Sequence, residues 1–204
     1  MTRNYFEQEL EKLDVHLLKM SSMVEETLNN AIKALKEQDV ELAQKVIDND
    51  DAIDEMEIAV EDECLKLIAL QSPLAKDLRM IATALRIITD LERVADYAVD
   101  ISKITIRLAH ETYIKELIDI PRMTEIISTM LRESIDSYVK QDVDKAQKAA
   151  QMDDEVDGIH KQIFKELLLI MMEDHEKINQ AAYFLFVSRY LERIGDHITN
   201  ICER

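Results

Sequence analysis

The sequence predicts an all-α protein built as a tandem pair of antiparallel three-helix bundles. The chain has only two glycines and two prolines in 204 residues, which leaves little material for turns. Helix-forming residues dominate, and 47% of all residues are hydrophobic, enough for a core. Apolar residues also recur at helical spacing along long segments. Finally, the same pattern of residues is present twice.

The internal repeat is visible in two stretches. Residues 36–54 (KEQDVELAQKVIDNDDAID) match residues 139–157 (VKQDVDKAQKAAQMDDEVD) at an offset of 103. Further along, LERVAD at 91–96 matches LERIGD at 191–196 at an offset of 100. A short indel between helices explains the change of offset. A unit of roughly 100 residues is too long for a solenoid repeat and has the size of a small bundle.

Three long helices are expected in the first half, over about residues 4–37, 40–70 and 73–109. Asp39 is the predicted N-cap of the second helix. The third helix is predicted to start with Ser72 as its N-cap and Pro73 at its first position, with Asp77 near its positive end.

The second half is expected to repeat this plan. The segment HETYIKELIDIP at 110–121 joins the halves, and the next helix is predicted to start at Pro121. Asp142 lies near the start of the following helix, and the segment EDHEKIN separates that helix from the last one. The predicted domains are therefore residues 1–110 and 111–204. Helices of about 30 residues are about 45 Å long and pack antiparallel when their connections are short.

The charge and the cysteines restrict the possible partners and the compartment. A net charge of −17 argues against binding to nucleic acid or to anionic membranes. No stretch is apolar enough to span a membrane, and the N-terminus has no signal peptide. Cys64 and Cys202 do not indicate a disulfide framework. We therefore expect a cytoplasmic protein without direct membrane insertion.

Acidic residues interrupt the apolar pattern of the third helix of each half. Glu92 falls in the heptad column of Leu78, Leu85 and Val99, which indicates a buried position, and Asp96 follows one turn later. Glu192 and Asp196 repeat this pair. Gly195 inside a helix costs about 1 kcal/mol relative to alanine, so we expect another group to approach closely there.

The second helix of each half carries a matching pair of acids four residues apart. Carboxylates that converge in one bundle must be paired or neutralised. Arg93 and Arg193 directly follow the glutamates and should point about 100° away around the helix. We therefore predict that a hard cation such as Mg, Ca, Mn or iron is bound in each half. The predicted ligands are Asp50, Asp54, Glu92 and Asp96 in the first half, and Asp153, Asp157, Glu192 and Asp196 in the second.

Four stretches of the chain resemble the PhoU family of bacterial and archaeal phosphate-signalling proteins: VIDNDDAIDEME, SPLAKDLR, LERVADYAVDI and LERIGDHITNI. The resemblance covers nearly the whole chain. It implies a pair of three-helix bundles whose E(D)xxxD motifs hold divalent or trivalent metal ions, as a multinuclear iron cluster in some members. The eight predicted ligands match these motifs.

The resemblance also implies a function. Members of the family are cytoplasmic negative regulators of the phosphate-starvation response and of phosphate uptake. They couple the ATPase of a phosphate-specific ABC transporter to a sensor histidine kinase. A homodimer is expected.

Several alternatives stay open. Asp51 and Asp154 could replace Asp50 and Asp153 as ligands, and Asp100 has Asn200 as its counterpart, so the two sites need not be equal. The DLR sequence at 77–79 is absent from the second half. The acids could also line a solvated groove or pair with arginines.

Two other classes of protein share parts of this pattern. A ferritin-like di-iron enzyme needs two ExxH motifs, and the nearest match is Asp157 with His160, present once. A helical scaffold protein without metal is the other class. Since no catalytic constellation or glycine-rich phosphate loop is visible, we expect no enzymatic activity.

Overall fold

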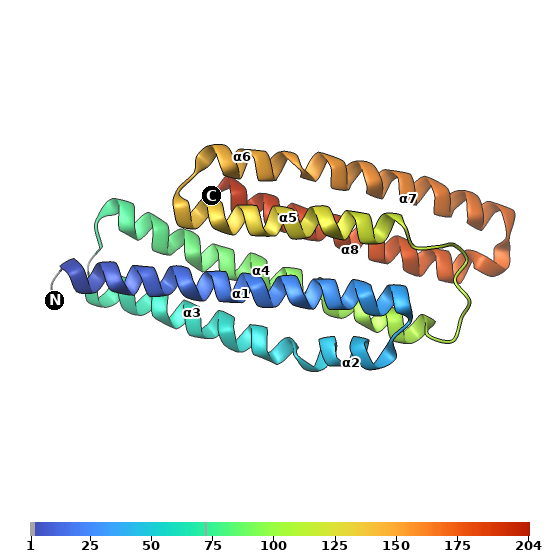
Figure 1. Cartoon of the computed structure of the whole chain (residues 1–204), viewed down its shortest axis with the longest axis horizontal. Coiled ribbons are helices and arrows are strands. Elements are labelled where there is room, and N and C mark those ends of the chain that lie inside the picture. The colour runs from blue at the N-terminus through green and yellow to red at the C-terminus, as the bar shows by residue number, and fades with distance from the viewer. Residues whose placement is uncertain (1–2, 72) are drawn as a thin grey trace.

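A computed structural model describes residues 3–71 and 73–204, and every regular element within these ranges is helical. The first half contains α1 (Arg3–Glu37), α2 (Val40–Asp48), α3 (Asp50–Gln71) and α4 (Ala75–Leu108). The second half contains α5 (Asp119–Lys140), α6 (Val143–Gln151), α7 (Asp153–Glu173), the short 3-10 helix η1 (His175–Lys177) and α8 (Ile178–Glu203) (Figure 1). The predicted all-α pair of antiparallel bundles is confirmed.

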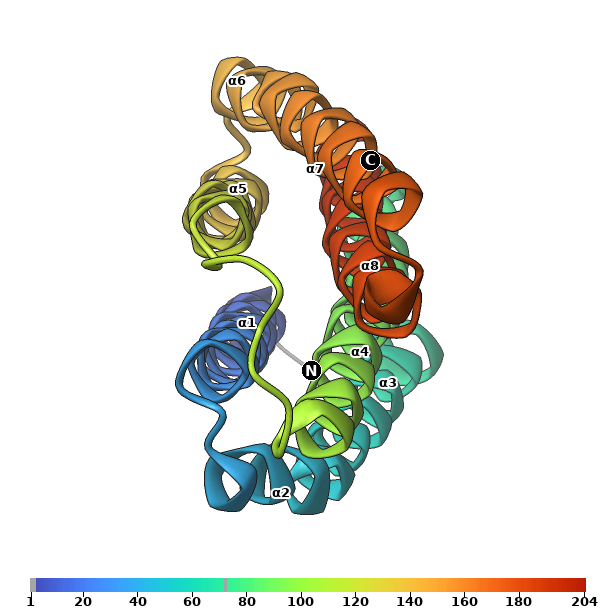
Figure 2. The ribbon, with the colours of Figure 1, turned by 90° about the vertical axis from the view of Figure 1, so that its right-hand side faces the viewer.

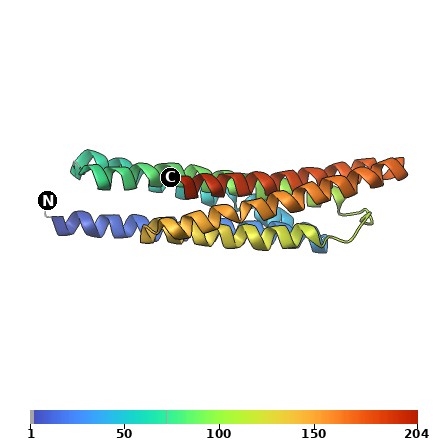
Figure 3. The same ribbon diagram turned by 90° about the horizontal axis from the view of Figure 1, so that it is seen from above.

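The two bundles pack along their length around a shared core. Viewed along the long axis, α1 and α5 form one side and α4 and α8 the other, while α2–α3 and α6–α7 close the two ends (Figure 2). The α4–α8 and α1–α5 contacts join the repeats. The repeats are also displaced along the long axis, so the α7–α8 turn projects at one end and the start of α1 at the other (Figure 3). The domain boundary at residue 110 stays a prediction.

Asp90 of α4 links the two repeats through charge. Its carboxylate is buried, with 6% of the residue exposed. His197 of α8 lies 3.0 Å from one carboxylate oxygen through Nδ1, and the guanidinium of Arg204 pairs with the other. A buried carboxylate needs such partners, so this cluster fixes how α8 lies against α4.

The start of the second helix in each half is confirmed. Asp39 Oδ1 accepts a hydrogen bond from the N–H of Leu42 at 2.9 Å, and Asp142 Oδ1 accepts one from the N–H of Lys145 at 3.0 Å. The residue before each cap, Gln38 or Gln141, has the same left-handed backbone with φ 54°. The repeats therefore share even an unusual backbone conformation.

The number of helices was predicted wrongly. The single helices expected over 40–70 and its counterpart are each broken, at Asn49 and Met152. Asn49 has ψ near 0°, so the chain bends there and α3 starts in a new direction. Short polar residues such as asparagine favour helix ends because their side chains compete for backbone hydrogen bonds. The short helix α2 can then bury its own apolar residues, Ala43 and Val46.

Two predicted helix starts are shifted. Leu74 is extended and precedes α4, so the helix begins at Ala75 and Pro73 lies outside it, although Asp77 is in the first turn as predicted. The predicted cap Ser72 lies outside the described residues. Helix α5 begins at Asp119, and Pro121 lies in its first turn, where the missing N–H has no partner to lose.

No helix in the described ranges combines the length and the low charge that a membrane crossing would need.

Gly195 of α8 faces the start of α7. A Cβ atom at this position would be 2.3 Å from Asp153 Oδ1 and 3.4 Å from Val156 Cγ1. The close approach expected from the sequence is thus present, and the approaching group is one of the predicted ligands. At Gly158, the other glycine, an added Cβ atom would meet nothing within 4 Å.

The two glycines should respond oppositely to alanine. Gly158→Ala should raise the free energy of unfolding by about 0.5–1 kcal/mol, because alanine favours the helix and meets nothing. Gly195→Ala should leave the free energy of unfolding unchanged or lower it, because the new Cβ atom would displace the Asp153 carboxylate. Urea unfolding of both variants measures the difference, and equal stabilisation would contradict the packing described for Asp153.

Candidate metal centres at the α3–α4 and α7–α8 contacts

The first cluster of predicted ligands lies at the contact between α3 and α4. Asp50 is the first residue of α3, and Asp54 follows one turn later. Glu92 and Asp96 come from the middle of α4. The break at Asn49 therefore gives Asp50 the positive end of a helix, which favours a negative charge. Sequence reasoning had placed this residue in the middle of a longer helix.

The acids of this cluster raise one another's pKa. Burial raises the pKa of Glu92 to about 7, and the charge of Asp96 adds to the shift. Burial also raises the pKa of Asp50, with further contributions from Asp54 and Asp96. The Glu92 side chain is 18% exposed, so it is half-buried and less enclosed than predicted. The four carboxylates thus share one electrostatic neighbourhood.

Arg93 reaches the acids, contrary to the prediction. Its Nη1 lies 2.8 Å from Asp96 Oδ2, and its Nε lies 3.4 Å from Glu92 Oε2. The predicted direction of the Cβ atom did not determine where the guanidinium lies, because the long arginine side chain folds back along the helix surface. Since the Arg93 side chain is 55% exposed, its ion pairs are screened by water and contribute little.

The second cluster repeats this arrangement between α7 and α8. Asp153 is the first residue of α7, and burial together with the charges of Asp196 and Asp157 raises its pKa to about 6. Arg193 again pairs with the acid four residues after the glutamate, at 3.0 Å from Asp196. Arg189 adds a contact of 2.7 Å to Glu192. The side chain of Glu192 is only 14% exposed.

Unsatisfied oxygens distinguish the second cluster. Among the described residues, the buried side-chain atoms without a hydrogen-bond partner are Asp153 Oδ1, Glu192 Oε2 and Thr199 Oγ1. Two of the three belong to predicted ligands. Arg193 Nε lies 3.7 Å from Glu192 Oε2, beyond hydrogen-bond distance, and the nearby Thr199 hydroxyl lowers the pKa of Asp153 without offsetting the rise caused by burial. Buried carboxylate oxygens without donors are costly, and an oxygen-only donor set is the one that hard cations prefer. The chemistry of these donors, though not their present arrangement, therefore suits a hard cation.

The side chains are not gathered into a complete coordination sphere. Within residues 3–71 and 73–204, no group of three or more His, Cys, Asp or Glu side chains is close enough to hold one ion. Arg93 holds Asp96 towards solvent, and Lys161 holds Asp157 in the same way at 2.8 Å. Convergence of each set of four on one point stays a prediction.

Two neighbours of these clusters were not among the predicted ligands. Glu57 and His160 are equivalent positions of the repeat, 103 residues apart. The charge of Glu57 acts on Glu92, and Glu57 Oε1 accepts a hydrogen bond from Thr89 at 3.1 Å. His160 Nδ1 lies 2.7 Å from the hydroxyl oxygen of Ser188. The heptad column that contains Asp50 or Asp153 also contains these residues, which was the available signal.

Comparison with known proteins gives a consistent result. The family model described as "PhoU domain" matches residues 17–105 and again 120–204. The phosphate-specific transport system accessory protein PhoU homolog of Clostridium acetobutylicum is 46% identical over all 204 residues, which cover 93% of that protein. The homolog of the same name in Aquifex aeolicus is 40% identical over 91% of this chain and 84% of its own length.

Solved structures agree with the sequence matches. The crystal structure of PhoU from Pseudomonas aeruginosa superposes with a TM-score of 0.92 at 36% identity, covering 97% of this chain and 95% of that one. The phosphate transport system regulatory protein PhoU from Streptococcus pneumoniae gives a TM-score of 0.90 at 31% identity, over 97% and 93%. The two family matches fall on the two repeats, and this chain belongs to the PhoU family.

Proposed function

We propose that this protein is a cytoplasmic, non-catalytic negative regulator of phosphate uptake and of the phosphate-starvation response. The observation that carries the proposal is similarity along the entire chain to proteins named as accessories of the phosphate-specific transport system, at 46% identity for the Clostridium acetobutylicum homolog. The similarity includes both repeats, each of which matches the family model.

The proposed partners are the ATPase of a phosphate-specific ABC transporter and a sensor histidine kinase. The net charge of −17 supports a role in binding, because broad acidic faces accelerate association with basic protein surfaces and make it sensitive to salt. A homodimer is part of this proposal. It is supported by an exposed apolar stripe on α7, formed by Phe164, Leu168 and Met172, of the kind that marks protein contacts.

Neither of the two cysteines is suited to act as a nucleophile. Burial raises the pKa of Cys64 to about 12 and that of Cys202 to about 11. Both thiols therefore stay protonated at neutral pH, whereas a nucleophilic cysteine must be a thiolate.

Deletion of the gene tests the regulatory role. In phosphate-rich medium the deletion strain should express phosphate-starvation genes that the wild type keeps silent, because the signal from transporter to kinase is interrupted. A reporter fused to a starvation promoter measures this. Equal, low expression in both strains, in a cell with no second gene of this family, would reject the assignment.

We further propose that each carboxylate cluster binds a divalent or trivalent metal ion, with iron and manganese as candidates. Asp50, Asp54, Glu92 and Asp96 would hold the first ion. The second would be held by Asp153, Asp157, Glu192 and Asp196. Support comes from the raised pKa values of Glu92 and Asp153 and from the buried oxygens without donors. A bound cation would neutralise the repulsion within each cluster.

Removing two ligands should separate metal binding from folding. The double variant Glu92→Ala with Asp96→Ala should lower the metal content of protein purified without chelator, as measured by elemental analysis. Its apo form should stay folded, because the loss of two acids relieves repulsion.

The matched control replaces two exposed acids of α3, Glu61→Ala with Asp62→Ala. It should retain the metal content of the wild type. Wild-type metal content in the Glu92 and Asp96 variant, or native protein that takes up no metal, would refute the first site.

A further inference from the structure

One position beside the predicted ligands differs in chemistry between the two clusters. The repeat offset of 103 pairs Glu57 in the first cluster with His160 in the second. A carboxylate keeps a cluster all-oxygen, which suits Mg²⁺, Ca²⁺ or Mn²⁺, whereas an imidazole nitrogen suits Zn²⁺ and Fe²⁺. The residue at this position therefore bears on which metal ion each cluster selects.

His160 lies on the face of α7 that carries the predicted ligands. Asp157 precedes it by three residues, so the two side chains are neighbours on the helix surface. Glutamate followed three residues later by histidine is the motif with which helices of di-iron proteins bind metal, and here aspartate takes the place of glutamate. Across the contact with α8, His160 Nδ1 lies 2.7 Å from the hydroxyl oxygen of Ser188, one turn before Glu192. His160 is thus next to two predicted ligands.

The contact with Ser188 orients the imidazole ring. Ser188 is fully buried, with 0% of the residue exposed. When Nδ1–H donates to its hydroxyl oxygen, the lone pair of the ring is on Nε2. Metal-binding histidines are held in this way, with one ring nitrogen donating to a protein group and the other on the ion. Among the described residues, Nε2 of His160 has no hydrogen-bond partner.

Glu192 offers an oxygen beside this imidazole. Its Oε1 accepts a hydrogen bond from Arg189 at 2.7 Å, whereas its Oε2 is buried and has no hydrogen-bond partner in the described part of the chain. Burial lowers the pKa of His160, and the charges of Glu192 and Asp157 partly oppose this shift. The imidazole and an unpaired carboxylate oxygen therefore share one electrostatic neighbourhood.

The first cluster is built differently at this position. Glu57 Oε1 accepts a hydrogen bond from the hydroxyl of Thr89 at 3.1 Å. The counterpart of Ser188 is Ile88, whose side chain has no atom that could accept a hydrogen bond from a ring nitrogen. The first cluster therefore offers a carboxylate where the second offers an oriented nitrogen.

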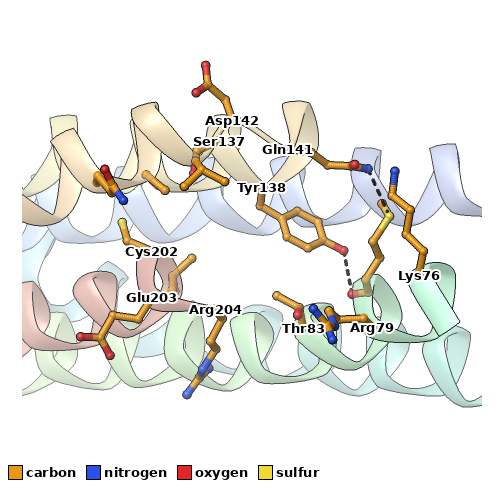
Figure 4. Close-up of a pocket in the computed structure, with 15 residues that line it drawn as sticks. Lys76, Arg79, Thr83, Ser137, Tyr138, Gln141, Asp142, Cys202, Glu203 and Arg204 are labelled. Carbon is orange, nitrogen blue, oxygen red and sulfur yellow. Dashed lines mark hydrogen bonds between the residues drawn. The ribbon is translucent and has the colours of Figure 1, made fainter.

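A thiol is the other ligand that would favour Zn²⁺, and Cys202 is the cysteine on which the charge of Asp153 acts. It lies fourteen residues after Ser188 on α8, which is about 21 Å along the helix. Cys202 lines the cleft beside the α5–α6 turn (Figure 4). Its sulfur is therefore too far along α8 to bind the same ion as His160.

We propose that Nε2 of His160 is a ligand of the second centre, beside Asp157 and Glu192, so that this centre selects Zn²⁺ and Fe²⁺ over Mn²⁺ more strongly than the all-carboxylate first centre does. The proposal rests on the proposed binding of metal ions by both clusters. Binding requires Asp157 to leave Lys161, with which it pairs at 2.8 Å. Because the Lys161 side chain is exposed, the loss of this ion pair costs little.

The metal selectivity of the second centre alone provides the test. The double variant Glu92→Ala with Asp96→Ala removes the first centre from the full chain. In this background, affinities for Zn²⁺ and Mn²⁺ are measured by competition with a chelating dye. His160→Glu, which introduces the carboxylate of the first repeat, should lower the ratio of Zn²⁺ affinity to Mn²⁺ affinity by about tenfold or more, because an oxygen replaces the nitrogen.

Two control variants in the same background should leave this ratio within about twofold of its starting value. His175→Glu makes the same exchange at an exposed histidine in η1, outside both clusters. Cys202→Ser removes the thiol.

The wild-type chain gives a direct readout of the ligand. In protein labelled with ¹⁵N-histidine, addition of Zn²⁺ should shift the Nε2 resonance of His160 and leave its Nδ1 protonated. The resonance is assigned by its absence from the spectrum of His160→Glu.

The outcomes separate this proposal from metal binding in general. Zn²⁺ binding that His160→Glu does not change, with an unshifted His160 resonance, would overturn the role of His160 and leave metal binding by the carboxylates standing. A lowered affinity ratio without a shift of the resonance would overturn it as well, because the added charge alone would account for the change. Protein that takes up neither Zn²⁺ nor Mn²⁺ would refute the second metal centre itself, and His160 as its ligand. The gene-deletion phenotype is independent of all these results.

Discussion

Both repeats must accommodate repulsion among carboxylates at their helix contacts. Each repeat places four acids where two helices pack, and burial raises the pKa of Glu92 and Asp153 there. Helix breaks at Asn49 and Met152 bring the positive ends of α3 and α7 to these acids. Arg93 and Arg193, which pair with these acids, have side chains that are 55% and 44% exposed. These features reduce the repulsion without removing it, which is the physical basis for proposing a cation in each cluster.

The sequence predicted the duplication, the N-cap Asp39, the helix start near Asp142 and the close approach at Gly195, because each depends on local spacing or on one residue's backbone preference. It did not predict the helix breaks, since the apolar periodicity continues across Asn49. It also misjudged Arg93, because periodicity gives the direction of a Cβ atom and not the path of a long side chain. The positions of the acids were predictable, whereas their rotamers and their degree of burial depend on the packed neighbours.

Duplication also explains how one chain can carry two unlike surfaces. The repeats keep the same backbone turn at Gln38 and Gln141, and Gln38 also donates to the carbonyl oxygen of Glu111 in the linker between the repeats. Lys103 beside the first acid cluster has Glu203 as its counterpart, and the unsatisfied oxygens lie only in the second repeat among the described residues. The fold is thus shared, while the charges that meet a metal ion or a partner differ between the halves.

Thermal unfolding with and without metal tests directly whether the carboxylate clusters bind a cation. A ligand at a hundredfold excess over its Kd stabilises the folded state by about 2.7 kcal/mol, which corresponds to a rise in Tm of roughly 5–10 °C for a chain of this size. We predict such a rise when Mn²⁺ or anaerobic ferrous iron is added to metal-free protein, and none when KCl supplies the same ionic strength. An unchanged Tm with both metals would contradict cation binding by the carboxylate clusters.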